Sequence, residues 1–126
     1  MFESGLQYVR ADFHLHTLKD KEFTYSGEST SFVGDYVSAL KNASINVGII
    51  TNHNKFDIEE YKAIRKAAKK QDIFILPGVE LTVKEGANGI HTLIVFNPEE
   101  WLENGNNHMI MILSSLINRK MISIIR

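Results

Sequence analysis

Apolar and polar positions alternate along the first hundred residues in two different rhythms. Short apolar segments, rich in β-branched side chains, occupy residues 6–16, 47–51, 73–79 and 90–96. Each is bounded by polar residues, which is typical of strands. We therefore predict four strands, of which the third would be extended by residues 81–83.

Two longer segments between these strands follow the helical period instead. Residues 32–44 repeat apolar side chains at helical spacing, and Thr30 or Ser31 stands where a cap is expected. The second segment opens with Asp57 and Glu60 at the spacing of a capping box, with Asp57 as the cap. Strands that alternate with helices are typical of a largely parallel α/β sheet or barrel.

Composition excludes several classes of protein. Of the 126 residues, 44% are hydrophobic and 23% are charged, which suits a packed core and not a disordered chain. A net charge of −1 gives no general attraction to nucleic acids or acidic membranes, and the lack of cysteine excludes thiolate metal sites. The longest aliphatic run, residues 109–113, is too short to span a bilayer, and the N-terminus lacks a signal-peptide pattern. We therefore expect a cytoplasmic protein.

A change of composition after residue 103 divides the chain. Residues 104–126 hold none of the 15 acidic residues. Apolar side chains recur there at the spacing of an amphipathic helix, at Met109, Ile112, Leu113, Leu116 and Ile117. We expect a domain over residues 1–103 and an apolar, helical tail over 104–126. The tail either covers the sheet or is unrelated to the preceding domain, as at a truncated or frame-shifted end.

Histidines and a glutamate stand at the ends of the predicted strands. His14 and His16 are two residues apart in the first strand, so their side chains share a face and can chelate one metal ion. His53 and Glu80 follow the second and third strands, whose carboxyl ends meet at one edge of a parallel sheet. His91 begins the fourth strand, and an antiparallel turn after Glu80 would bring it to the same edge. Imidazoles and carboxylates without sulfur suit Zn, Mn or Fe.

Four short motifs stand in order along residues 8–97. They are Asp12-Phe13-His14-Leu15-His16-Thr17, Thr51-Asn52-His53-Asn54, Pro77-Gly78-Val79-Glu80-Leu81 and Ile90-His91-Thr92-Leu93. This series resembles the N-terminal part of the PHP (polymerase and histidinol phosphatase) superfamily. The resemblance implies an α/β fold, the N-terminal portion of a distorted (β/α)7 barrel, with up to three divalent metal ions at the carboxyl ends of the strands. It also implies a phosphate-ester substrate, hydrolysed by metal-activated water.

The resemblance further implies a set of metal ligands. By motif match these are His14, His16, His53, Glu80 and His91, with Glu80 placed to bridge two ions. Members of the family carry one more ligand shortly after the His-x-His motif. Glu22 stands at the favoured offset for that role, and Asp20 is the alternative.

Two features depart from the PHP pattern. Asn52 stands where the family usually has Asp, which is expected to weaken the orientation of a neighbouring ligand. The family's later ligands, a further His and a terminal Asp-x-His, have no counterpart, since only His108 follows His91 and no Asp follows Asp72. We therefore expect a truncated barrel with an incomplete metal site.

Two functional hypotheses follow. The first is a PHP-type metal-dependent phosphoesterase that is incomplete in this chain. The second is a catalytically silent metal-binding module, or the front of a larger protein, because the motifs look most like PHP domains that precede ATPase regions. For both we expect Zn, Mn or Fe as the cofactor and no membrane or indicated nucleic-acid partner. The expected partner is a missing C-terminal half or a second copy of the chain.

Overall fold

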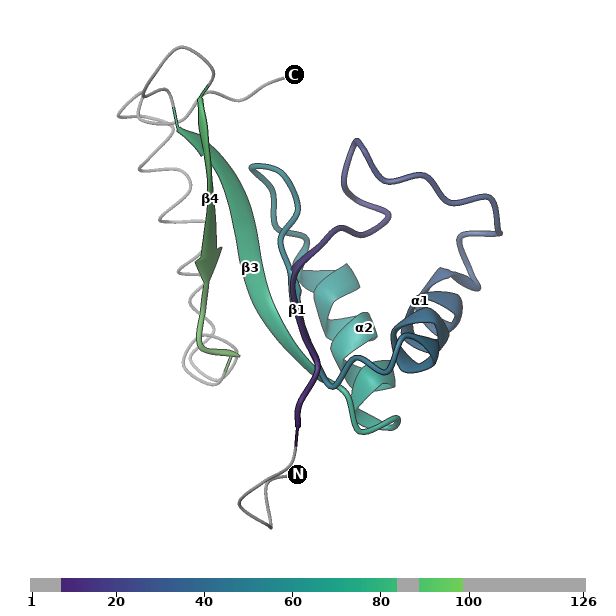
Figure 1. Cartoon of the computed structure of the whole chain (residues 1–126). Coiled ribbons are helices and arrows are strands. Elements are labelled where there is room, and N and C mark those ends of the chain that lie inside the picture. The colour runs from purple at the N-terminus through teal and green to yellow at the C-terminus, as the bar shows by residue number, and fades with distance from the viewer. Residues whose placement is uncertain (1–7, 84–88, 99–126) are drawn as a thin grey trace.

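The chain alternates strands and helices, as its apolar pattern predicts. The structure is a computed structural model that describes residues 8–83 and 89–98. Its elements, in chain order, are β1 (Ala11–Leu15), α1 (Phe32–Asn42), β2 (Val47–Ile50), α2 (Ile58–Lys69), β3 (Phe74–Val83) and β4 (Ile90–Val95) (Figure 1). Within these ranges, no helix is both long and apolar enough to cross a membrane.

The four strands form one sheet in the order β1-β2-β3-β4. β1, β2 and β3 run parallel, because a helix-containing connection returns the chain to the same end of the sheet each time. β4 runs antiparallel to β3, with Glu80 opposite Leu93 and Thr82 opposite His91. The first half of β3 pairs with β2 and the second half with β4, and Figure 1 shows it as the long, curved strand that joins the two parts. The described strands therefore form an open, curved sheet in an α/β arrangement.

Both helices pack on one face of this sheet (Figure 1). Their apolar sides supply Val37 and Leu40 from α1, and Tyr61 and Ile64 from α2. These side chains and the strand residues beneath them form one core cluster. Tyr61 is held there through its hydroxyl, which donates to the carbonyl of Ile75 at 2.9 Å. Burial raises the pKa of Tyr61 to about 12, so the hydroxyl stays a donor.

The two helices begin differently. Asp57 caps α2, because its carboxylate accepts the backbone N–H of Glu60 at 2.9 Å. Only this half of the predicted capping box forms, since the Glu60 carboxylate accepts a hydrogen bond from the hydroxyl of Thr17 instead. Ser31 stands at the cap position of α1, but its backbone is helical there and its hydroxyl donates to the carbonyl of Glu28. The position of the α1 cap is therefore as predicted, while the side-chain bond is not made.

The alternation expected along β1 is interrupted. The register to β2 shifts between Asp12 and Leu15. Leu15 packs against the core, whereas Phe13 is 59% exposed. A one-residue irregularity of this kind interrupts the strict alternation of side chains along a strand. The predicted helical tail and the division at residue 103 lie outside the described residues, as do residues 84–88 between β3 and β4.

Candidate metal centre

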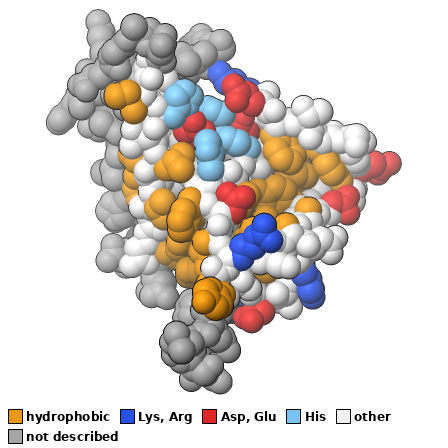
Figure 2. Space-filling model, viewed as in Figure 1, with side chains coloured by type: hydrophobic (Ala, Val, Ile, Leu, Met, Phe, Trp, Pro, Cys, Tyr) orange, Lys and Arg blue, Asp and Glu red, His pale blue; other side chains and the backbone are white. Residues whose placement is uncertain are grey.

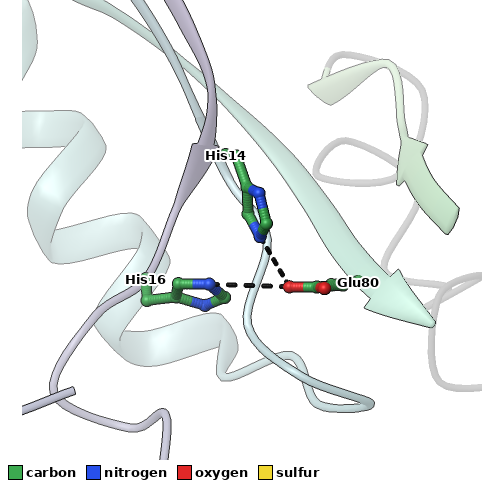
Figure 3. Close-up of side chains that lie close together, drawn as sticks. All are labelled: His14, His16 and Glu80. Carbon is green, nitrogen blue, oxygen red and sulfur yellow. Dashed lines mark hydrogen bonds and ion pairs between the residues drawn. The ribbon is translucent and has the colours of Figure 1, made fainter. Parts of the chain in front are cut away.

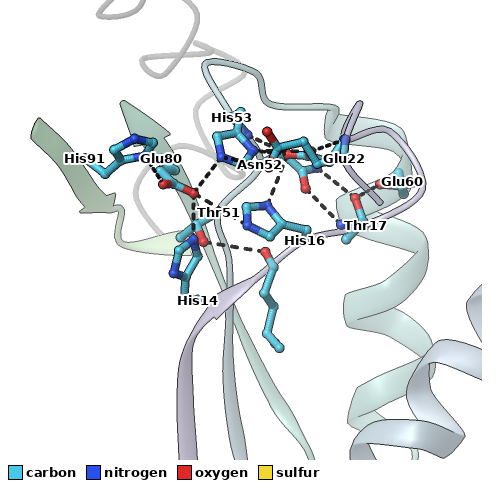
Figure 4. Close-up of polar contacts among 12 residues, drawn as sticks. His14, His16, Thr17, Glu22, Thr51, Asn52, His53, Glu60, Glu80 and His91 are labelled. Carbon is cyan, nitrogen blue, oxygen red and sulfur yellow. Dashed lines mark hydrogen bonds and ion pairs between the residues drawn. The ribbon is translucent and has the colours of Figure 1, made fainter. Parts of the chain in front are cut away.

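Four histidines and two acidic residues gather at one edge of the sheet. His14 and His16 come from the end of β1, His53 follows β2, Glu80 lies in β3 and His91 in β4. Figure 2 shows the imidazoles as one patch with carboxylates among them, and Figure 4 shows how they point toward one another. The two imidazoles from the end of β1 and that of His53 stand at the carboxyl ends of parallel strands, and Glu80 lies in β3 just beyond the residues that pair with β2. The antiparallel pairing of β4 with β3 brings His91 to the same place, as expected from the sequence.

The backbone after β2 is fixed directly to β3. His53 pairs with Glu80 in an isolated parallel bridge. Glu80 donates its backbone N–H to the carbonyl of Asn52 at 3.0 Å, and Asn54 donates its own to the carbonyl of Glu80 at 2.8 Å. Because three consecutive residues are tied to Glu80, the imidazole of His53 is held beside the glutamate by main-chain bonds.

Glu80 lies at the centre of the cluster and is only 2% exposed. Its Oε2 atom is 2.6 Å from Nε2 of His14, 3.2 Å from Nε2 of His53 and 3.5 Å from Nε2 of His16. Figure 3 shows how His14 and His16 converge on this oxygen. The other oxygen, Oε1, contacts Nδ1 of His91. Burial alone would raise the pKa of Glu80, but hydrogen bonds from His14 and His91 outweigh it and lower that pKa, so the carboxylate is ionised.

Asp20 lies on the opposite side of two of these rings, and its side chain is fully buried. Its Oδ2 atom is 3.1 Å from Nδ1 of His16 and 3.0 Å from Nδ1 of His53. It also accepts the backbone N–H groups of His53 at 2.7 Å and Glu22 at 2.8 Å. Burial would raise the pKa of Asp20, but these hydrogen bonds outweigh it and lower the pKa to about 2.

Glu22, the acidic residue that the sequence favours as the extra ligand, lies at the rim. Its side chain is 64% exposed, and its Oε2 atom is 3.5 Å from Nε2 of His53. Within the described residues, three groups have ligand atoms close enough to hold a metal ion. They are His14, His16 and Glu80; His16, Asp20 and His53; and His53, Glu80 and His91. The structure therefore places Asp20, the alternative, among these groups and leaves Glu22 at their margin.

The donor set fits a divalent cation. His16 and His53 each have a carboxylate near both ring nitrogens, Asp20 at Nδ1 and Glu80 at Nε2. A neutral imidazole has a single N–H, so it can satisfy only one of its two carboxylates. A cation between Nε2 and Glu80 would meet the other carboxylate and the ring lone pair at once. Imidazole nitrogens and carboxylate oxygens are ligands for Zn, Mn and Fe.

A second polar network, which the sequence does not single out, lies beneath the cluster. Asn52 accepts the backbone N–H of Thr17 at 2.9 Å and donates to the Thr17 hydroxyl at 2.7 Å. That hydroxyl in turn donates to Glu60 in the first turn of α2. Asn52 therefore uses both ends of its amide to fix the turn after His16. Thr17 and Asn52 stand inside the sequence motifs, whereas Glu60 is signalled only by its place in the capping box.

The backbone of His16 is also held from α1. Tyr36 donates its hydroxyl to the carbonyl of His16 at 2.8 Å. Burial raises the pKa of Tyr36, with smaller contributions from the charges of Glu60 and Asp12, so this hydroxyl remains a donor. The His-x-His segment is thus anchored to both helices.

No protein-family model matches the chain. A search of curated proteins gives no significant match either.

Proposed function

We propose that this chain is the metal-binding part of a PHP-type, metal-dependent phosphoesterase. The observation that carries the proposal is the buried Glu80 carboxylate, which has imidazole nitrogens from three separate parts of the sheet around its two oxygens. Buried carboxylates surrounded by imidazoles are costly unless a cation or a proton compensates them. The order of the four sequence motifs supports the same proposal.

The proposed ligands are His14, His16, His53, Glu80 and His91, with Glu22 at the rim. Zn, Mn or Fe ions bound there would lower the pKa of a water ligand and offset the charge of a phosphate ester. The residues of the chain orient these ligands through Asp20, through the Asn52–Thr17 network and through the backbone bonds to Glu80.

Exposure indicates where a substrate would approach. The side chains of His14 and His91 are about half exposed, at 49% and 51%, whereas that of His53 is 12% exposed. Asp20 and Glu80 lie behind these rings with almost no exposed surface. A phosphate ester would therefore reach the cluster between His14 and His91, with the carboxylates on the protected side.

The second candidate is a silent metal-binding module, either alone or as the front of a larger ATPase-containing protein. One observation favours it, namely that residues 92–126 contain neither an Asp nor the Asp-x-His pair of the family. Fewer ligands would hold fewer ions, and fewer ions would activate water and bind phosphate less well. We therefore expect phosphoesterase turnover by this chain alone to be weak or undetectable.

Metal content tests what the two candidates share. The purified chain should retain transition metal by elemental analysis, and the His14→Ala/His16→Ala variant should lose most of it. His108→Ala is the matched control, since His108 lies outside the motifs, and it should keep the wild-type content. Equal and negligible metal in all three proteins would contradict both candidates.

Hydrolysis of an aryl phosphate tests whether this chain is catalytically competent by itself. The assay would use added Mn²⁺ or Zn²⁺, with a chelator control and the His14→Ala/His16→Ala variant beside the wild type. Chelator-sensitive turnover that the double variant lacks would assign the phosphoesterase. Bound metal without such turnover is the result we expect of this chain alone, and it would show that the chain does not form a catalytic site by itself.

A further inference from the structure

The carboxylate of Asp20 is saturated by donors of its own chain. A carboxylate has about four lone-pair sites for hydrogen bonds. Asp20 accepts the backbone N–H groups of Glu22 and His53, and it also lies within hydrogen-bond distance of the Nδ1 atoms of His16 and His53. The two backbone bonds, at 2.8 and 2.7 Å, are present whatever the state of the rings. Little of this carboxylate is left for a metal ion.

The local chain explains why Asp20 points inward. Asp20 donates its backbone N–H to the carbonyl of Thr17 at 2.9 Å, which closes a tight turn directly after the His-x-His motif. Phe23 donates its N–H to the carbonyl of Asp20 at 3.2 Å and continues the turn. This geometry places Asp20 four residues after His16 and directly beside its ring.

The two rings that Asp20 touches are arranged as a pair. The centroids of His16 and His53 are 4.6 Å apart, and the ring planes differ by only 2°. Both rings turn Nδ1 toward Asp20 and Nε2 toward Glu80. The Nδ1 atoms, at 3.1 and 3.0 Å from Asp20, have hydrogen-bond geometry, whereas the Nε2 atoms lie farther from Glu80, at 3.5 and 3.2 Å. An ionised carboxylate only accepts hydrogen bonds, so this geometry favours the hydrogen on each Nδ1. In the neutral rings, both Nε2 atoms then present lone pairs toward Glu80.

We propose that Asp20 is a positioning residue that fixes His16 and His53 in the Nδ1–H tautomer, so that their Nε2 atoms are the metal-binding atoms. The inference rests on the proposed function. It assigns Asp20 to the shell behind the ligands, where a carboxylate that accepts the second N–H of a metal-binding histidine orients the ring. The extra acidic ligand would then be Glu22, whose carboxylate lies on the Nε2 side of His53.

Nuclear magnetic resonance of the metal-free chain tests the tautomers directly. Long-range ¹H–¹⁵N spectra of the imidazoles, recorded at a pH where the rings are neutral, distinguish Nδ1–H from Nε2–H. We expect His16 and His53 to be Nδ1–H in the wild type. In Asp20→Asn they should shift toward Nε2–H, because the amide accepts less strongly than a carboxylate. Glu22→Gln is the matched control and should leave both tautomers unchanged.

Metal titration supplies a second readout. Competition with a chromophoric chelator should show Asp20→Asn binding Zn²⁺ about 10- to 100-fold more weakly than the wild type, with the number of bound ions unchanged. Loss of an ion from Asp20→Asn with no loss from Glu22→Gln would make Asp20 a ligand and overturn the proposal.

The wild-type spectrum alone keeps the proposal falsifiable if Asp20→Asn does not fold. Nε2–H tautomers at His16 or His53 in the wild-type protein would overturn it. A folded Asp20→Asn variant in which His16 and His53 keep the wild-type tautomers would also overturn it. These spectra need no metal, so a chain that binds none would refute the proposed function while the Nδ1–H result at Asp20 still stood.

Discussion

At the scale of single residues, the buried carboxyl groups differ in what surrounds them. Asp20 accepts backbone N–H groups, which outweigh the effect of its burial and lower its pKa. Glu60 has fewer compensating donors. Its pKa is raised, first by burial and further by the charge of Asp57, although the hydroxyl of Thr17 opposes the change. Glu60 is therefore a carboxylate whose charge costs stability, while its hydrogen bond to Thr17 supports the site.

The Glu60→Gln variant should separate these two effects. A raised pKa in the folded state contributes stability below the ordinary value of 4.5, and that contribution is lost as the pH rises through the folded value. Gln still accepts from Thr17 but carries no charge. We expect the stability of the variant, relative to wild type, to increase from pH 4.5 to pH 7. Urea denaturation of chelator-treated protein measures it, and a difference that is constant with pH would contradict the raised pKa.

Two glycines should respond in opposite directions to the same substitution. A Cβ at Gly78 would lie 2.8 Å from the carbonyl oxygen of Ile94 and 3.0 Å from side-chain carbons of Ile49 and Thr51. Backbone cannot yield cheaply, so Gly78→Ala should cost about 1–3 kcal/mol. A Cβ at Gly34 in α1 has no such neighbour within 4 Å, and Gly34→Ala should add up to about 1 kcal/mol from helix propensity. Chemical denaturation of both variants checks this, and equal effects would contradict the crossing of β4 over Gly78.

At the scale of elements, the caps of the two helices predict a second contrast. Asp57→Ala removes the bond to the backbone of Glu60 and should cost about 1 kcal/mol of stability. Ser31→Ala removes a hydroxyl that makes no cap bond to α1, so the loss should stay below about 0.5 kcal/mol. Urea unfolding of the two variants measures the difference. A larger loss in Ser31→Ala would show that Ser31 is the cap that matters.

The elements were predictable because their signals are local. Apolar period and the Asp57 cap depend on neighbouring residues, and the observed helices and strands follow them within a few positions. The placement of Asp20 depends instead on how the polar segment before α1 folds. Phe23 there packs edge-on against Phe32 and Tyr36, and such tertiary contacts leave no periodic signal. The irregular register of β1 likewise leaves no signal in the apolar pattern, so the exposure of Phe13 could not be predicted from the sequence.

The cluster itself was predictable to the extent that parallel topology dictates it. Residues at the carboxyl ends of parallel strands meet, so the convergence of His14, His16, His53 and Glu80 follows from strand assignment alone. The choice between Asp20 and Glu22 does not follow from it. Side chains in a loop have no regular period, so the sequence does not indicate which of the two points toward the cluster. The Thr17–Glu60 bond joins residues 43 positions apart and could be found only in three dimensions.

At the scale of the whole molecule, the open sheet predicts self-association. In the part of the chain that the structure describes, β1 and β4 are the edge strands, and Phe13, Phe74, Leu93 and Val95 are substantially exposed. Unpaired edges and exposed apolar side chains favour pairing with another copy. Light scattering should show oligomers that Phe13→Lys/Val95→Lys reduces. Ala63→Lys, which adds a lysine on the exposed side of α2, is the control and should not reduce them. A monomeric wild type would contradict this expectation.

Metal binding should stabilise the molecule as a whole, because the ligands come from both ends of the described chain and link β1, β3 and β4. A ligand that binds only the folded state adds about 2.7 kcal/mol at a free concentration of 100 times its Kd. For a domain of this size each kcal/mol corresponds to about 4–8 °C in Tm. We expect Zn²⁺ or Mn²⁺ to raise the Tm of the wild type measurably, and to leave that of His14→Ala/His16→Ala almost unchanged. Calorimetry with and without chelator checks it, since an equal shift in both proteins would place the stabilising ion elsewhere.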